Sequence, residues 1–322
     1  MEKGLALIKD DLQKVEEEYK KRLVSRVPLI TTVAEHLVMS GGKRFRPTLL
    51  LLSARLCGYQ GDDHIPLAGV IEFIHTATLL HDDVIDNAEV RRGSASANTL
   101  WGNEASVLVG DFLFSRSFAM MVEVGDLRIL QTLALATTAL AEGETMELVK
   151  TADLSITEEE NLELIINKTA VLISAAARIG AILGKAPLEV EDALAYYGLQ
   201  VGIAFQLADD CLDYIGEKEA LGKEIGSDLK EGKITLPLIH SLGHCTSEER
   251  KEIQEIVQSD EFPPDGLQKA ISFIKKYNGI DYTFAKAQQY ISEGKNKLMT
   301  IPPSPEREAF LEMADYVVER RI

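Results

Sequence analysis

Three carboxylates crowd into residues 79–86, directly after a run of apolar side chains. Asp82 and Asp86 are four residues apart and Asp83 and Asp86 are three apart, spacings that place side chains on one face of a helix. Ionised carboxylates held so close repel one another unless a cation lies between them, and oxygen ligands alone suit Mg²⁺ or Mn²⁺. Arg91 and Arg92 follow shortly afterwards, so we expect an anion beside the metal. Such an arrangement suits a diphosphate.

The same spacing recurs at Asp209, Asp210 and Asp213, again after an apolar run that includes Phe205 and Leu207. A single acidic cluster on a helix is more often a solvated face. Two copies, each preceded by apolar residues, are hard to place on a surface. We therefore predict two metal-binding clusters that serve the same kind of anion.

Cations also gather in the segment 42–47, where a helix is expected to begin. Helix starts usually favour acids, so Lys43, Arg44 and Arg46 at this place indicate a bound anion. The glycine in front of them lets the backbone approach a ligand closely. The alternative is an ordinary basic loop before a helix.

Other polar residues have two interpretations each. His75 lies seven residues before Asp82 and on the same helical face, either as a ligand contact or as a packed histidine. Lys168 stands among small and apolar residues, where a lysine needs an anionic partner. Lys223 and Lys233 belong to a glycine- and lysine-rich segment after the second cluster, which is either a phosphate-holding lid or a solvated loop.

Composition limits the class of protein. The chain has 322 residues and a formal net charge of −17, which argues against nucleic-acid binding. Its three cysteines, Cys57, Cys211 and Cys245, have no metal-ligand spacing, and the N-terminus has no secretory apolar segment. No apolar run reaches the about 18 residues that a membrane-spanning helix needs. We therefore expect a cytoplasmic protein.

Apolar residues recur at helical spacing along most of the chain, and no stretch shows the alternation of a strand. Helices are expected over residues 4–24, 28–40, 47–57, 66–88, 126–151 and 189–215, with others after Trp101 and Thr157 and shorter ones after residue 233. The two acidic clusters can face each other only if both halves share a core. The prediction is a single all-α domain spanning residues 1–322, a helical bundle around a deep central cavity.

This set of residues resembles the trans-isoprenyl diphosphate synthase (polyprenyl synthetase) family over nearly the whole chain. The matching positions, in family order, are residues 42–47, both Asp-Asp-x-x-Asp clusters, Arg91, Arg92, Lys168, Thr169, Phe205, Gln206 and Lys233. The resemblance implies the isoprenoid synthase fold, usually in a homodimer, and a Mg²⁺-dependent prenyltransferase. It implies about three Mg²⁺ ions per active site, which Mn²⁺ is able to replace.

The resemblance also implies a role for each matching residue. The metal ligands are Asp82, Asp83, Asp86, Asp209, Asp210 and Asp213, and the catalytic set is Asp82, Asp83, Asp86, Lys168 and Asp209. Isopentenyl diphosphate is bound by Lys43, Arg46, His75 and Arg92. The allylic diphosphate, or the charge that develops on it, is bound by Arg91, Lys168, Thr169, Gln206, Lys223 and Lys233.

The chemistry implied is ionisation of the allylic substrate. Metal ions and cationic side chains stabilise the departing diphosphate. The double bond of isopentenyl diphosphate, held nearby, attacks the allylic cation, and loss of a proton leaves a product longer by one isoprene unit. In the family the released diphosphate takes that proton, so no protein base is expected.

Residues before the first cluster bear on product length. Short-chain members often carry a bulky aromatic residue there, whereas this chain has Ala77 and Thr78. These small side chains leave the tunnel open, with Phe118 or Met121 as the next floor. We expect a medium- or long-chain all-trans product, made from farnesyl or geranylgeranyl diphosphate, of the kind that supplies quinone side chains. Glu147 departs from the pattern, because long-chain relatives often have Gln there, and the sequence leaves its effect open.

Other functions share part of this pattern. A short-chain farnesyl or geranylgeranyl diphosphate synthase would share every motif. A class I terpene cyclase normally lacks the second Asp-rich cluster and the segment 42–47, and a non-catalytic regulatory subunit usually loses one or both clusters. The intact clusters count against these two. A very apolar product also makes transient membrane contact for product release plausible, although no motif supports it.

Overall fold

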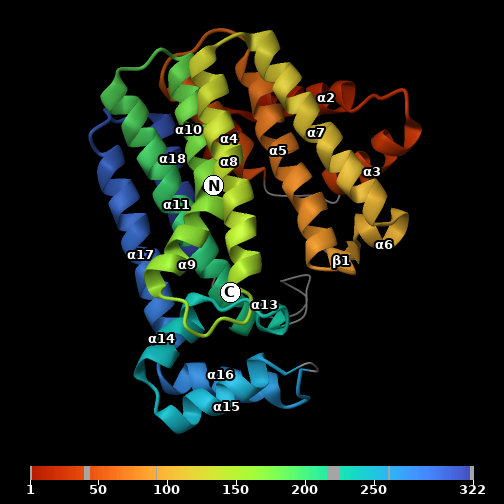
Figure 1. Cartoon of the computed structure of the whole chain (residues 1–322). Coiled ribbons are helices and arrows are strands. Elements are labelled where there is room, and N and C mark those ends of the chain that lie inside the picture. Colours follow the sequence, from red (N-terminus) through yellow and green to blue (C-terminus); the bar gives the residue numbers. More distant parts are fainter. Residues whose placement is uncertain (1, 40–43, 92, 216–224, 260–261, 320–322) are drawn as a thin grey trace. The chain divides into compact units, whose positions relative to one another are not determined.

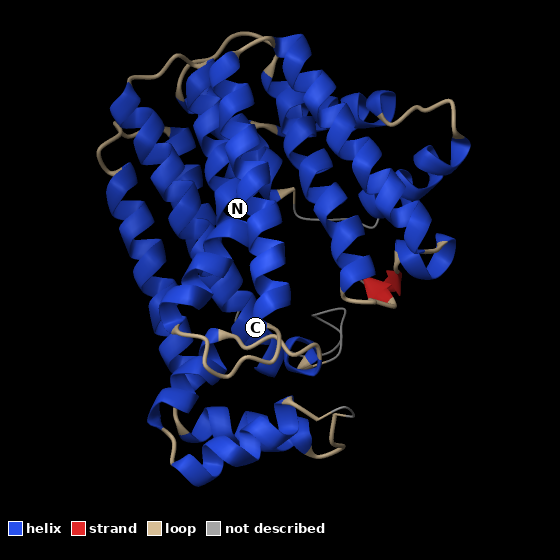
Figure 2. Cartoon of the chain, viewed as in Figure 1, coloured by secondary structure: helices blue, strands red, loops and turns tan. Residues whose placement is uncertain are grey.

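The computed structural model of the chain describes residues 2–39, 44–91, 93–215, 225–259 and 262–319. The described elements are helices, apart from one short antiparallel pair of strands (Figure 2). The prediction of an all-α fold is confirmed. Lys43, Arg92 and Lys223 lie outside the described residues, so their roles stay predictions.

The helices and strands of the described residues follow one another along the chain in the order given next. They are α1 Glu2–Leu7, α2 Lys9–Arg22, α3 Pro28–Met39, α4 Phe45–Leu56, α5 His64–Ile85, β1 Val90–Arg91, β2 Ser94–Ala95, α6 Ala97–Trp101, α7 Asn103–Val124, α8 Leu127–Lys150, α9 Glu158–Ile165, the π-helix η1 Ile166–Ala170, α10 Val171–Leu183, α11 Leu188–Ile215, α13 Ser227–Lys230, α14 Leu236–His244, α15 Ser247–Val257, α16 Gly266–Lys276, α17 Gly279–Leu298 and α18 Pro305–Glu319. The helix expected over residues 4–24 is divided at Ile8, and the other expected ranges differ by a few residues at their ends.

The chain divides into two compact units. Unit 1 comprises Met1–Thr137, Leu172–Gly198 and Asn296–Met313, and unit 2 comprises Thr138–Val171, Leu199–Lys295 and Ala314–Ile322. The prediction of one domain around a central cavity stays a prediction.

In unit 1, α5 packs against α2, α4 and α7, and Figure 1 shows it lying beside α7. Most of its residues between Ile65 and Leu80 are buried, because a helix that is apolar on every side must be covered on every side. The ring of Phe73 meets that of Tyr19 edge-on at 4.8 Å. These contacts fix the helix that carries the first acidic cluster.

The small residues of α10 serve helix packing in unit 1. A Cβ atom on Gly180 would lie 2.5 Å from the carbonyl oxygen of Leu50 in α4. Ser53 of α4 donates a hydrogen bond to the carbonyl oxygen of Ala177 at 2.6 Å. At Gly180 the small residues of α10 therefore allow α4 and α10 to pack closely.

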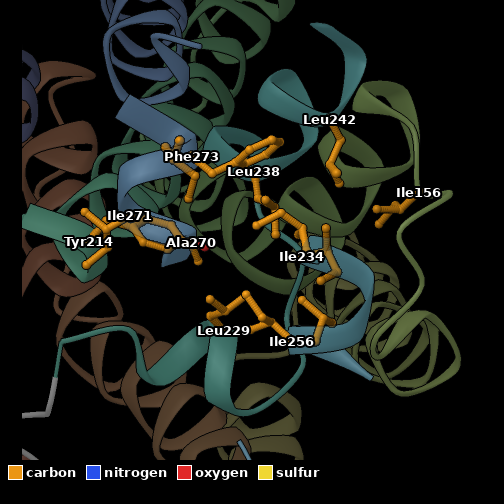
Figure 3. Packing of buried hydrophobic residues seen from close by; sticks show 13 residues of the cluster. Ile156, Tyr214, Leu229, Ile234, Leu238, Leu242, Ile256, Ala270, Ile271 and Phe273 are labelled. Carbon is orange, nitrogen blue, oxygen red and sulfur yellow. The ribbon is translucent and has the colours of Figure 1, made fainter. Parts of the chain in front are cut away.

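In unit 2, a hydrophobic cluster joins α15 and α16 to the end of α11 and to the segment after it (Figure 3). Its buried members are Ile156, Tyr214, Leu229, Ile234, Leu238, Leu242, Ile253, Ile256, Val257, Ala270, Ile271, Phe273 and Ile274. Tyr214, Leu229 and Ile234 directly follow Asp213, Asp228 and Lys233 in the chain. This set of buried residues, the base cluster, therefore anchors the backbone beside those polar residues.

Within the described ranges, two helical stretches are long and apolar enough to cross a membrane by length and composition alone. They are Asn103–Val124 and Glu158–Leu183, and an 18-residue window within each is 44% and 67% buried inside the protein, respectively. The expectation concerned an uninterrupted apolar run of about 18 residues, and both helices are interrupted by charged residues such as Asp111 and Lys168. Core helices of soluble proteins pass the same test, so the finding is weak evidence for a membrane span.

Candidate functional site

The first acidic cluster lies at the C-terminal end of α5, in unit 1. Asp82 and Asp83 belong to its last turn, and Asp86 is its C-cap residue. The helix carbonyl groups at this end carry partial negative charge, which adds to that of the carboxylates and favours a cation. Asp82 and Asp86 are partly exposed, whereas Asp83 is fully buried.

Asp83 is held by Arg91 of β1. The Arg91 Nε atom donates a hydrogen bond to Asp83 Oδ1 at 2.6 Å, and Asn98 Nδ2 donates one to the Asp83 carbonyl oxygen at 3.0 Å. Asp83 Oδ2 is buried and accepts no hydrogen bond from the described residues. Burial raises the pKa of Asp83, and the charge of Arg91 opposes that rise. Arg91, predicted to bind a diphosphate, here contacts the carboxylate beside it.

The second acidic cluster lies near the C-terminal end of α11, in unit 2. Asp209 is partly exposed, whereas Asp210 and Asp213 are almost fully buried. Asp213 Oδ2 accepts a hydrogen bond from the backbone N–H of Asp228 at 3.2 Å. Burial, followed by the nearby charge of Asp228, raises the pKa of Asp210 well above its ordinary value. A divalent cation would reverse that effect, because it stabilises the ionised carboxylate.

The donor atoms fit a hard divalent cation that arrives with other ligands. Both clusters offer carboxylate oxygens, which Mg²⁺ prefers, and Asp83 Oδ2 is a buried oxygen whose desolvation a cation would offset. Among the described residues, no three His, Cys, Asp or Glu side chains converge closely enough to hold a metal ion. Protein-bound Mg²⁺ usually keeps waters and substrate phosphates as ligands. The arrangement therefore suits ions that bind together with a diphosphate.

Lys168 and Thr169 lie in a widened helical turn. The capping box of Thr157 and Glu160 starts α9 as the sequence predicts, and after Ile165 the helix continues as η1. A Cβ atom on Gly143 of α8 would lie 2.9 Å from the Lys168 backbone nitrogen, and one on Gly202 of α11 would lie 2.6 Å from Ala170 Cα. The missing side chains make room for the wide turn. Such turns are frequent at functional sites, and sequence reasoning missed this one.

A chain of hydrogen bonds links this turn to the second acidic cluster. Thr169 Oγ1 donates to Gln206 Oε1 at 2.9 Å. Gln206 Nε2 donates to Asp210 Oδ1 at 2.8 Å. The structure thus brings together three predicted site residues from two helical elements, and it fixes which way the Gln206 amide points.

Two lysines of unit 2 share one carboxylate. Lys168 Nζ lies 3.0 Å from Glu144 Oε2 and closer still to Glu147 Oε2. Lys233 Nζ lies 3.9 Å from the same Glu147 oxygen and 2.8 Å from Glu231 Oε2. The anionic partner expected for Lys168 is therefore present on α8. Sequence reasoning noted Glu147 only as a departure and did not single out Glu144.

Lys168, Lys233 and Glu147 line a pocket of about 120 Å³. Its lining residues are Glu147, Lys150, Thr151, Ile156, Asn161, Leu164, Ile165, Lys168, Thr169, Gln206, Asp210, Asp228, Gly232, Lys233, Ile234 and Thr235. Pockets for whole drug-sized ligands measure about 300–1,000 Å³, so this volume suits a charged headgroup.

The remaining predicted residues lie in unit 1. Arg46 is on α4 and His75 on α5, both partly buried. Ala77 is fully buried, and Thr78 donates a hydrogen bond to the His75 carbonyl oxygen at 2.8 Å. The two acidic clusters belong to different units, so the prediction that they face each other stays a prediction.

Arg44 of the basic segment 42–47, which was expected to bind an anion, contacts carboxylates of the protein itself. Its side chain contacts Glu16 at 2.8 Å and Glu72 at 3.5 Å, and it lies over the Tyr19 ring. Arg44 therefore ties the start of α4 to α2 and α5. The two acids were not visible as partners in the sequence because they are far from Arg44 along the chain.

The chain is similar to known proteins over its whole length. The model of the family described as polyprenyl synthetase matches residues 27–274. The octaprenyl diphosphate synthase of Escherichia coli (strain K12) is 41% identical over 99% of both chains. The structure of a polyprenyl synthase from Caulobacter crescentus CB15, complexed with calcium and isoprenyl diphosphate, is 40% identical with a TM-score of 0.96, covering 100% of this chain and 98% of that one. A decaprenyl diphosphate synthase from Rhodobacter capsulatus is 40% identical with a TM-score of 0.95, covering 99% and 98%.

Proposed function

We propose, since this chain belongs to the polyprenyl synthetase family, that its pocket in unit 2 holds the diphosphate of an allylic substrate. The chain is a prenyltransferase of the polyprenyl diphosphate synthase type. It joins isopentenyl diphosphate to an allylic diphosphate and makes a medium- or long-chain all-trans polyprenyl diphosphate. The observation that carries the assignment of the pocket is that Lys168, Lys233 and the buried Asp210 line the same small cavity.

Mg²⁺ is the metal proposed for both acidic clusters. Asp82, Asp83 and Asp86 would hold it at the end of α5, and Asp209, Asp210 and Asp213 at the end of α11. When bound, it supplies positive charge that stabilises the departing diphosphate. The carboxylate oxygen donors, among them the buried Asp83 Oδ2, support this choice.

The side chains of the pocket then have defined tasks. Lys168 and Lys233 donate hydrogen bonds to diphosphate oxygens as the bond to the allylic carbon breaks. Thr169 holds the Gln206 amide, and Gln206 in turn holds Asp210, so the hydrogen-bond chain keeps that carboxylate in place. The reaction needs no protein base, because the released diphosphate is able to take the proton that is lost as the new double bond forms.

Product length is assigned to the helix face before the first cluster. Ala77 and Thr78 are small, and a growing chain that passes them is limited by bulkier residues further on. Farnesyl or geranylgeranyl diphosphate is the proposed starter. If the chain is instead a short-chain synthase, elongation should stop near Ala77 although this side chain is small.

A homodimer is proposed through α7. This helix exposes Val107, Leu108, Phe118 and Val122, which is unusual for the surface of a monomer. Sedimentation should give twice the chain mass, and Leu108→Glu should shift it toward the monomer.

We also propose a cytoplasmic enzyme that releases its product through transient contact with a membrane. The apolar character of a long polyprenyl chain supports this.

One incubation tests the reaction and the product length together. The purified chain receives isopentenyl diphosphate, farnesyl diphosphate and Mg²⁺, with an EDTA control, and products are sized by mass spectrometry. Mg²⁺-dependent formation of hexaprenyl diphosphate or longer is the expected result. Products that end at geranylgeranyl diphosphate would support the reaction assignment. They would refute the prediction that Ala77 and Thr78 let the product grow longer. No elongation would refute the enzyme assignment for the isolated chain.

A further inference from the structure

The starting observation is the position of Glu147 between the two lysines of the pocket. One oxygen, Oε2, contacts Lys168 Nζ and lies 3.9 Å from Lys233 Nζ. Each lysine has another carboxylate partner, Glu144 for Lys168 and Glu231 for Lys233, and Glu147 lies near both. Its carboxylate therefore lies where a diphosphate oxygen would bridge the same two ammonium groups.

Partial burial strengthens these contacts. The side chains of Lys168, Lys233 and Glu147 are each about one-fifth exposed, so water screens their charges less than on an open surface. An ion pair of this kind must be broken or shared before a substrate oxygen takes its place.

The charge balance of the pocket points the same way. Its lining contains three lysines, Lys150, Lys168 and Lys233, and as many acids, Glu147, Asp210 and Asp228. Lys150 is engaged with Asp153 at 3.3 Å and Glu160 at 2.8 Å, outside the group that surrounds Glu147. Glu147 offsets part of the positive charge of Lys168 and Lys233, so removing its charge would make the surroundings of a diphosphate more positive.

We infer that Glu147 is an internal anion that competes with the allylic diphosphate for Lys168 and Lys233, so it sets the affinity of the site for that diphosphate. The inference rests on the proposed function for the identity of the natural ligand. The competition acts on the headgroup alone. Its effect is the same for short and long allylic substrates and is absent for isopentenyl diphosphate.

The experiment replaces Glu147 by its uncharged isostere. Glu147→Gln should lower the KM for farnesyl diphosphate and the Kd for inorganic diphosphate in Mg²⁺ by about fivefold each, the effect of removing a partly screened ion pair. The KM for dimethylallyl diphosphate should fall by the same factor, and that for isopentenyl diphosphate should stay constant. Unchanged or higher values for the allylic substrates and for inorganic diphosphate would overturn the inference.

A matched control separates local competition from total charge. Glu142 is an exposed residue of α8 within the same unit, so Glu142→Gln makes the same charge change away from the lysines. It should leave the KM and Kd values as in the original protein. If both variants tighten diphosphate binding equally, the effect comes from net charge and the inference fails.

Failure of the proposed function has a different signature. The titration with inorganic diphosphate reports on Glu147 without any turnover. If diphosphate binding tightens in Glu147→Gln while the original protein makes no prenyl product, the competition stands and the reaction assignment falls. If turnover is normal but diphosphate affinity does not change, the reaction assignment stands and the competition falls.

Discussion

Gly143 is the residue whose replacement tests most directly how the site is positioned. In Gly143→Ala the new Cβ atom would lie 2.9 Å from both Asn167 Cβ and the Lys168 backbone nitrogen. Ordinary contacts of a Cβ atom begin at 3.4 Å, so η1 and α8 must separate by about 0.5 Å. Because the atom in the way belongs to the backbone of Lys168, the displacement moves the ammonium group relative to the pocket.

The size of the change expected in Gly143→Ala follows from two opposing effects on the unfolding free energy and one effect on kcat. Overpacking costs about 1–3 kcal/mol of unfolding free energy, and alanine in a helix returns about 1 kcal/mol relative to glycine. We therefore expect a net loss of about 0–2 kcal/mol, which leaves the protein folded. A displacement approaching 1 Å at a catalytic group costs about 100-fold in rate, so half of that displacement should lower kcat by about 10-fold.

The assay is steady-state elongation of farnesyl diphosphate, with thermal unfolding measured on the same samples. Gly243→Ala is the control, because a Cβ atom there meets nothing within 4 Å. That control should keep its turnover and gain about 0.5–1 kcal/mol of stability. Gly202→Ala, which meets Ala170 from the other side, should behave like Gly143→Ala. Normal kcat in both Gly143→Ala and Gly202→Ala would refute the reasoning.

Other outcomes are expected on the same grounds. Asp82→Ala and Asp209→Ala should each lower kcat by about 100-fold or more without changing the unfolding temperature greatly, and near-normal turnover in either would contradict the metal assignment. Ala77→Phe should shorten the product while Ala77→Ser does not, as mass spectrometry of the products would show; an unchanged product spectrum would place the floor elsewhere. Hydrogen bonds from Lys276 and then Tyr277 lower the pKa of Glu249 from 4.5 to about 2. The ionised Glu249 therefore stabilises the folded state fully above pH 4.5, and this stabilisation is lost as the pH falls toward 2. Glu249→Gln should therefore melt earlier at neutral pH and match the original protein near pH 2, and a difference that grows on acidification would contradict this.

Features that depend on local spacing could be predicted from the sequence. Both acidic clusters lie at the ends of long helices as expected, because apolar periodicity and the Asp-Asp-x-x-Asp pattern are local signals. The start of a helix after Thr157 could be predicted for the same reason.

Features that depend on distant partners could not be predicted. The π-helical turn needs glycines on two other helices, Gly143 and Gly202, and nothing within residues 166–170 signals it. The contacts of Arg44 with Glu16 and Glu72 join residues 28 positions apart in each case. Glu147 was noticed as an unusual residue, but only the fold shows that it reaches both lysines.

The base cluster couples the stability of α15 and α16 to ligand binding at the substrate site. Tyr214, Leu229 and Ile234 are buried with α15 and α16, and their chain neighbours Asp213, Asp228 and Lys233 belong to the second acidic cluster and its surroundings. Any ligand that holds those neighbours more tightly in the folded state must, by thermodynamic linkage, also oppose the opening of α15 and α16. Reciprocally, destabilising these helices lowers the affinity of the site for the ligand. Backbone amides of α15 and α16 should therefore exchange with deuterium more slowly once diphosphate and Mg²⁺ are bound, although neither helix carries a predicted site residue.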